Sequence, residues 1–174
     1  ELCNNATLPD CQIGYQKPMS THLLALQSAL ENLPQTSRLM GLDLGTKTIG
    51  IATSDRSRQI ATPITTITRT KFTKDATELL AIATKETVGV LVLGLPINMD
   101  GTEGPRAQAT RAFARNLAKL TPLAIVFWDE RLSTAAVERM LIDADASRAT
   151  RDKVVDKLAA AWILQAALDA LRQS

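Results

Sequence analysis

The sequence predicts an α/β fold, built on a mixed five-stranded sheet that is flanked by helices on both faces. Three observations lead to this prediction. A β-hairpin pattern begins near residue 39, two continuous apolar runs follow later in the chain, and helical patterns alternate with those runs. Continuous apolar runs are typical of strands buried on both faces, which need helices on both sides of the sheet. The length of 174 residues fits one domain.

The first three expected strands differ in pattern from the later ones. Residues 39–44 and 48–53 are two strands, and Gly45-Thr46-Lys47 supplies the turn between them, with a glycine that tolerates a positive φ. Residues 60–68 form a third strand that is rich in β-branched side chains. Pro63 interrupts it and cannot donate a hydrogen bond to a neighbouring strand, so we expect this strand near an edge of the sheet.

Two buried strands and four helices complete the predicted domain. Pro105 lies where the first turn of a helix would begin, a position that suits a residue without an N–H group. The expected elements, in chain order, are a helix at 75–86, a strand at 88–93, a loop at 94–104, a helix at 105–120, a strand at 123–128, and helices at 133–142 and 151–171.

Residues 1–37 differ from the rest of the chain. They are polar and unpatterned at first, and a short expected helix at 22–33 ends at Pro34. We treat this stretch as an N-terminal extension that is partly disordered or added by cloning, and we place the functional domain at 38–174. The sequence does not begin with a basic segment followed by an apolar one, so we expect no signal peptide. Because the extension carries none of the candidate chemistry, its removal should leave activity largely unchanged.

The composition restricts the class of function. No apolar run approaches the ~20 residues of a membrane helix, and the two cysteines, Cys3 and Cys11, favour a reducing, cytoplasmic setting. The single histidine, His22, cannot form a zinc site with its neighbours, so we expect any metal to be Mg²⁺ or Mn²⁺ held by oxygen. Of the 20 bases and 18 acids, one base and three acids lie in residues 1–37, which leaves 19 and 15 for the rest. This mildly basic balance permits a nucleic-acid partner.

Acidic residues interrupt otherwise apolar elements at three places. Asp43 lies inside the first strand, although aspartate is disfavoured in strands; capping of the turn at Gly45 is its alternative role. Asp129 and Glu130 directly follow the last apolar strand, at the end where functional groups gather in α/β sheets. A local ion pair with Arg131 is the alternative for these two acids.

Asp156 is the third place. It lies one full turn inside the C-terminal helix, on a face otherwise formed by Ala159, Ala160 and Ile163. A carboxylate on an apolar face is costly to bury without a partner, which either a cation or a pair with Lys153 would supply. Acids from the first strand, a later strand end and the last helix can converge at one end of the sheet. Several close carboxylates are typical of two-metal sites for phosphoryl transfer.

Four segments resemble the motifs of a known family. In order along the chain they are GLDLGTKTIGIA (41–52), VLGLPINMDGTEGP (92–105), DERLST (129–134) and VDKLAAAWILQ (155–165). Together they closely resemble the YqgF/RuvX family of bacterial RNase H-like proteins, which are described as Holliday-junction resolvases and as nucleases for the 5′ end of pre-16S rRNA. The resemblance covers about residues 38–172. It implies an RNase H-like nuclease domain at 38–174.

The resemblance also implies roles for individual residues. It implies that the catalytic and metal-binding carboxylates are Asp43, Glu130 and Asp156, with Asp129 beside them as a candidate further ligand, and that they hold Mg²⁺ or Mn²⁺. RNase H-like sites usually contain four carboxylates, and the fourth is not obvious here. Besides Asp129, weak candidates are Asp152 and Asp100.

Several basic and polar residues are candidate substrate contacts. Arginine suits bidentate binding of phosphate, and lysine supplies a compact positive charge. Lys47 and Asn98 have an alternative role in their turns. The candidates are Lys47, Asn98, Arg131, Arg151 and Lys153. Four more bases recur along one expected helix, which is more typical of a solvated face: Arg106, Arg111, Arg115 and Lys119.

Two other functions fit parts of the sequence. The segment at 41–52 also resembles the first phosphate loop of actin-like ATPases and sugar kinases, but the chain is one domain in size and lacks a second such loop. A non-catalytic nucleic-acid-binding module is the second alternative. The sequence leaves open whether the substrate is rRNA or a DNA junction, whether cleavage is endo- or exonucleolytic, and whether the protein is a monomer or a homodimer. We expect no membrane partner.

Overall fold

The structure is a computed structural model that describes residues 18–130 and 148–174, with side chains described for 21–130 and 156–174. Within these ranges the sheet order is β3-β2-β1-β4-β5. β2 is antiparallel to β1 and β3, whereas β4 is parallel to β1 and β5. This is the order of an RNase H-like sheet, and the predicted mixed sheet is confirmed. The strands are β1 (Arg38–Leu44), β2 (Thr48–Ser54), β3 (Ala61–Thr68), β4 (Val88–Leu95) and β5 (Ala124–Asp129).

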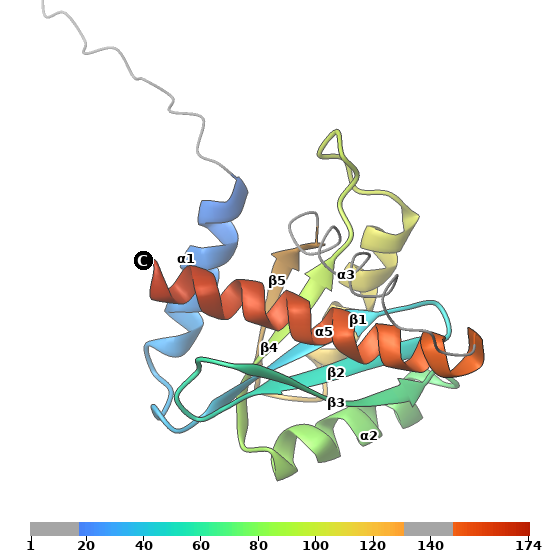
Figure 1. Cartoon of the computed structure of the whole chain (residues 1–174), viewed down its shortest axis with the longest axis horizontal. Helices are drawn as coiled ribbons and strands as arrows, with labels where there is room; N and C mark the ends of the chain where they lie inside the picture. The colour runs from blue at the N-terminus through green and yellow to red at the C-terminus, as the bar shows by residue number, and fades with distance from the viewer. Residues whose placement is uncertain (1–17, 131–147) are drawn as a thin grey trace, which may run out of the picture.

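Helices cover both faces of this sheet, as predicted (Figure 1). α2 (Phe72–Lys85) and α3 (Pro105–Leu117) bury their apolar side chains on one face. α1 (Pro18–Leu30) and α5 (Arg148–Arg172) do so on the other. The helix expected at 133–142 lies outside the described residues. None of the helices in the described ranges is long and apolar enough to cross a membrane.

β1 sends alternate side chains to the two faces, as a strand must. Met40 and Leu42 are fully buried in the core formed with α2 and α3. Leu39 is fully buried in the core formed with α5. Asp43 has the same parity as Leu39, so alternation directs its carboxylate to the α5 side, among positions that are otherwise apolar or glycine.

α5 lies directly against the strands because glycines remove the side chains that would separate them. A Cβ on Gly50 would lie 2.0 Å from the backbone oxygen of Asp156, and one on Gly41 would lie 2.6 Å from that of Ala160. Any larger residue at either position would push the helix outward, since backbone atoms cannot rotate away as a side chain can. This close approach holds Asp156 over the beginning of β2.

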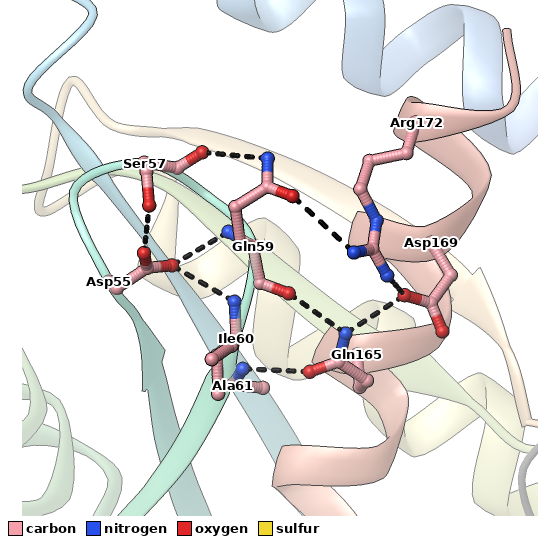
Figure 2. A network of polar contacts seen from close by, with 8 residues as sticks. All are labelled: Asp55, Ser57, Gln59, Ile60, Ala61, Gln165, Asp169 and Arg172. Carbon is pink, nitrogen blue, oxygen red and sulfur yellow. Dashed lines mark hydrogen bonds and ion pairs between the residues drawn. The ribbon is translucent and has the colours of Figure 1, made fainter.

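Hydrogen bonds join the C-terminal half of α5 to the β2–β3 connection (Figure 2). The side-chain amide of Gln165 accepts a hydrogen bond from the Ala61 N–H at 2.8 Å and donates one to the Gln59 carbonyl at 3.0 Å. Asp55 closes the same connection by accepting hydrogen bonds from the N–H groups of Gln59 and Ile60, at 2.7 and 2.9 Å. The helix is therefore fixed along its length.

β3 is an edge strand of the sheet, as its proline predicts. Pro63 lies opposite Ala52, and the register between the two strands shifts between Ile51 and Ala52. An edge strand tolerates a residue without an N–H group because only one side of it must be paired.

α1 belongs to the same core as the rest of the domain. Leu26 is completely buried, in a cluster that includes Trp128 of β5 and Leu168 of α5. Leu33 follows the helix, and its side chain lies 2.8 Å from where a Cβ on Gly89 would be. The boundary expected after residue 37 therefore does not coincide with a break in packing. The sequence shows the apolar face of this helix but not the strands that it covers.

Candidate active site

Two of the predicted acids meet across strand β4. Asp43 lies in β1 opposite Gly50, and the neighbouring residue Leu42 is paired with Leu93 of β4. Gly94 comes next in β4, and a Cβ there would lie 2.4 Å from the Oε1 atom of Glu130. The carboxylate of Glu130 therefore lies over this glycine, beside the strand that carries Asp43.

The third predicted acid approaches from α5. Thr48, at the start of β2, donates a hydrogen bond from its hydroxyl to the Oδ2 atom of Asp156. The backbone of Asp156 lies against Gly50, which is the residue opposite Asp43 in the sheet. Figure 1 shows the turn between β1 and β2 beside the N-terminal part of α5. The acids at positions 43, 130 and 156 are thus brought together from three elements.

Asp43 interacts electrostatically with both of the other acids. Burial raises its pKa from 3.8 to about 6, with the charge of Asp156 as the next cause, while the charge of Arg106 acts in the opposite direction. Burial also raises the pKa of Glu130, from 4.5 to about 7, followed by the charge of Asp43. Arg106 again lowers the pKa, and Asp129 raises it. Ionisation of these two carboxylates is therefore disfavoured, first by burial and then by the charges of neighbouring acids.

This donor set fits a divalent cation. Its oxygens are carboxylate oxygens, which Mg²⁺ and Mn²⁺ prefer, and a cation would offset the repulsion that raises both pKa values. Within the described residues, no three acidic, cysteine or histidine side chains surround one point closely enough to hold a single ion. The acids instead interact as two pairs that share Asp43, with Asp156 on one side and Glu130 on the other.

Asp129 is placed differently from Glu130. Its exposed fraction is only 5%, and it is the last residue of β5, opposite Leu95. Trp128 packs in the core on the α5 side, so alternation directs the side chain of Asp129 to the other face of the sheet. Its charge still raises the pKa of Glu130. Asp129 therefore stays a candidate further ligand beside Glu130.

The loop between β4 and α3 is closed by its own polar groups. Asn98 donates from its side chain to the hydroxyl of Thr102 at 2.9 Å, and its carbonyl accepts from the Gly101 N–H at 2.8 Å. Asp100 accepts hydrogen bonds from the N–H and hydroxyl of Thr102, at 2.9 and 2.7 Å. The interactions observed for Asn98 and Asp100 are therefore those of turn formation, which is the alternative role expected for Asn98.

The other predicted contacts are only partly described. Lys47 is exposed in the turn between β1 and β2, directly before Thr48. Arg131 lies outside the described residues, and the side chains of Arg151 and Lys153 do too, although their backbone belongs to α5. The side chain of Asp152 is likewise outside the described part.

Arg106 is a residue whose position the sequence did not reveal. It was expected on a solvated helix face, yet its charge lowers the pKa of both Asp43 and Glu130. It follows Pro105 in the first turn of α3, which begins where the loop from β4 ends. The signal that could have found it is this location, since loops after the carboxyl ends of parallel strands carry functional groups. Helical periodicity alone could not have identified Arg106 as part of the site.

Comparison with known proteins adds a family to this geometry. The sequence model described as "RuvX: Holliday junction resolvase" matches residues 37–170. A protein of Paracoccus denitrificans named "Putative pre-16S rRNA nuclease" is 60% identical over 147 residues, covering 84% of this chain and 93% of its own length. A protein of the same name from Rhodopseudomonas palustris is 62% identical over 153 residues, covering 88% and 94%.

Solved structures of resolvases align over much of the chain with low identity. The yeast mitochondrial Holliday junction resolvase aligns with a TM-score of 0.48 and 12% identity, covering 86% of each chain. RuvC of Thermus thermophilus aligns with a TM-score of 0.47 and 10% identity, covering 76% of this chain and 97% of its own. The family model and the relatives at about 60% identity are decisive, and this chain belongs to the RuvX family.

Proposed function

We propose that this protein is a metal-dependent nuclease that hydrolyses phosphodiester bonds at the 5′ end of pre-16S rRNA. The single observation that carries the proposal is the convergence of three carboxylates from β1, α5 and the end of β5, with Asp43 interacting with both of the others. Their residue types and their arrangement in pairs suit phosphodiester hydrolysis assisted by metal ions. The names of the relatives supply the substrate.

The ligands of the metal ions would be Asp43, Glu130 and Asp156, with Asp43 shared between the pair that it forms with Asp156 and the pair that it forms with Glu130. A bound divalent cation supplies a polarised water for attack and positive charge for the leaving oxygen. Each carboxylate must be ionised to bind it, so the raised pKa values of Asp43 and Glu130 make binding weaker at acidic pH. Thr48 orients the carboxylate of Asp156 through its hydroxyl.

Arg106 has a place in the same scheme. Its positive charge reaches Asp43 and Glu130 from the first turn of α3, and its side chain is exposed at that position. An arginine beside a metal site can bind a phosphate oxygen of the substrate, because its guanidinium matches the geometry of phosphate. We assign it to holding the scissile region of the strand against the three carboxylates.

A second candidate substrate is a four-way DNA junction. The description of the matching family favours it, since that description is a Holliday junction resolvase. The chemistry is the same, but symmetric cutting of a junction requires two active sites and therefore a homodimer. Cleavage of an RNA leader requires only one site, so a monomer would suffice in the cytoplasm, where the rRNA precursor is made.

One experiment tests the activity and chooses between the substrates. The purified protein is incubated with a labelled RNA that contains the 5′ leader of 16S rRNA and, separately, with a labelled four-way DNA junction. Each reaction contains Mn²⁺, Mg²⁺ or a chelator. We expect metal-dependent cleavage of the RNA, loss of that cleavage in Asp43→Asn, and normal cleavage by the control Glu78→Gln, an exposed acid on α2.

The outcomes separate clearly. Cleavage of the junction alone, together with a dimer in solution, would replace the rRNA proposal with the resolvase function. Nucleic-acid binding without cleavage, whatever metal is added, would indicate a non-catalytic binding module. Full activity of Asp43→Asn would contradict the assignment of the carboxylates.

A further inference from the structure

Two segments that are far apart in the sequence are joined beside the three carboxylates. The backbone N–H of Arg69, just after β3, donates to the carbonyl of Lys47 at 2.8 Å. The Nη1 atom of Arg69 donates to the carbonyl of Gly45 at 2.7 Å. The turn between β1 and β2 and the segment between β3 and α2 therefore lie side by side (Figure 1).

This surface carries positive charge that no ion pair of the described residues neutralises. Lys47 and Lys71 are exposed, and Arg69 is partly exposed. Among the described residues the ion pairs are Arg38–Glu86, Arg111–Glu103 and Arg172–Asp169, none of which involves these three bases. The nearby acid Asp75 is buried and accepts hydrogen bonds from the N–H and hydroxyl of Thr70. We call Lys47, Arg69 and Lys71 the basic rim.

The basic rim adjoins the candidate active site on one side. Gly45, to which Arg69 donates, is two residues after Asp43. Thr48, which holds Asp156, directly follows Lys47. Arg106 reaches the carboxylates from α3, and the loop before α3 continues from β4 on the other side of β1. Positive charge therefore lies on two sides of the three acids, with Arg106 on one side and the basic rim on the other.

The guanidinium of Arg69 is held in position to bind an anion. Its side chain donates one hydrogen bond in the described part of the chain, from Nη1 to the Gly45 carbonyl, which leaves Nε and Nη2 to bind an anion. A guanidinium fixed by one contact loses less conformational freedom when it binds phosphate, and its fork suits two phosphate oxygens. The hydrogen bond to Gly45 explains the position of Arg69 but not the two exposed lysines beside it.

We propose that the basic rim binds the backbone phosphates of the substrate strand on the β2–β3 side of the bond to be cut. This inference rests on the proposed nuclease function. It adds the path of the substrate strand, which crosses the carboxylates between Arg106 and the rim. The contacts are to phosphates and not to bases, so the rim contributes affinity and register but no sequence preference.

The test is the salt dependence of RNA binding. Asp43→Asn serves as the common background, so that RNA is not cut, and the probe is the fluorescently labelled 5′ leader RNA. Each phosphate contact contributes about 0.7 to the slope of log K against log salt for single strands and about 0.9 for duplexes. Adding Lys47→Gln and Lys71→Gln together should reduce the slope by roughly 1.4 to 1.8. Lys85→Gln with Lys119→Gln, which are exposed bases outside the rim, is the matched control.

Arg69→Lys provides the second measurement. It keeps the charge but removes the planar fork, so we expect weaker binding at every salt concentration with the slope nearly unchanged. An unchanged slope in the double lysine variant, in a background that binds the RNA, would overturn the rim and leave the nuclease proposal standing. If the unsubstituted protein neither binds nor cleaves the RNA or the junction, the nuclease proposal fails and the rim fails with it.

Discussion

The hydroxyl of Thr48 donates a hydrogen bond to the carboxylate of Asp156, across the contact between β2 and α5. This bond orients a proposed metal ligand without binding the metal itself. Such outer contacts typically contribute about 10- to 100-fold to metal affinity or activity. Thr48→Val keeps the shape of the side chain but removes the donor, so we expect cleavage to fall by roughly tenfold and the Mn²⁺ concentration for half-maximal activity to rise.

The control for Thr48 is its partner in the sheet. Thr68 lies opposite Thr48 in β3 and is exposed. Thr68→Val should leave the metal requirement unchanged. If both variants require the same Mn²⁺ concentration as the unsubstituted protein, the hydroxyl of Thr48 does not position Asp156 for metal binding.

The charge of Asp156 has a measurable effect on Asp43. It is the second cause, after burial, of the raised pKa of Asp43. Asp156→Asn should therefore abolish cleavage while moving the pKa of Asp43 downward, with apo stability unchanged or raised by up to roughly 1–2 kcal/mol. NMR titration of the side-chain carboxyl of Asp43, without metal, measures this shift. An unmoved titration would show that these two carboxylates do not interact.

The pH dependence of the metal-free protein follows from two raised pKa values. Asp43 and Glu130 titrate at about 6 and about 7 in the folded state, against ordinary values of 3.8 and 4.5. The folded state therefore holds more protons than the unfolded state between those limits, so the contribution of these groups is fully present below about pH 4 and is lost as the pH rises through 7. Asp43→Asn should be more stable than the unsubstituted protein at pH 8, by up to about 3 kcal/mol, and nearly equal at pH 4.

Thermal melts from pH 4 to pH 8 with a chelator measure this difference. Added Mn²⁺ should stabilise the unsubstituted protein more at pH 8 than at pH 5, because it binds the ionised carboxylates. A constant difference between the two proteins over the whole pH range would mean that Asp43 titrates normally.

The sequence predicted most of the sheet because its strands carry local signals. Alternation in β1 correctly directs Asp43 away from Leu42, and Pro63 correctly marks an edge strand. The proximity of the three acids is a matter of tertiary structure, and the resemblance of four motifs implied it before any geometry was known. Thr48 and Arg106 were not predicted as parts of the site, because their positions depend on how β2 meets α5 and how α3 begins beside β4.

The roles of two glycines in the sheet are a second feature that could not be predicted from the sequence. Gly94 provides space for the Glu130 carboxylate, whereas Gly50 provides space for the backbone of α5. Gly94→Ala should displace the side chain of Glu130, which can rotate away. We expect activity to fall about 100-fold, with a smaller loss of stability than in Gly50→Ala. Gly50→Ala should push against backbone atoms and destabilise the fold by about 1–3 kcal/mol. Thermal melts of both variants measure this contrast in stability, and equal losses of stability would contradict it.

The role of α1 provides the last prediction. Leu26 is fully buried against Trp128 and Leu168, whereas Leu24, on the same helix, is 60% exposed. Leu26→Ala leaves a cavity in the core and should cost about 2–5 kcal/mol in the free energy of unfolding, while Leu24→Ala should have little effect. Chemical denaturation of the two variants provides the comparison. A loss of that size would show that residues 18–30 are part of the domain, so that deleting everything before residue 38 would impair folding instead of leaving the nuclease intact. Equal stability of the two variants would restore the view that this stretch is a dispensable extension.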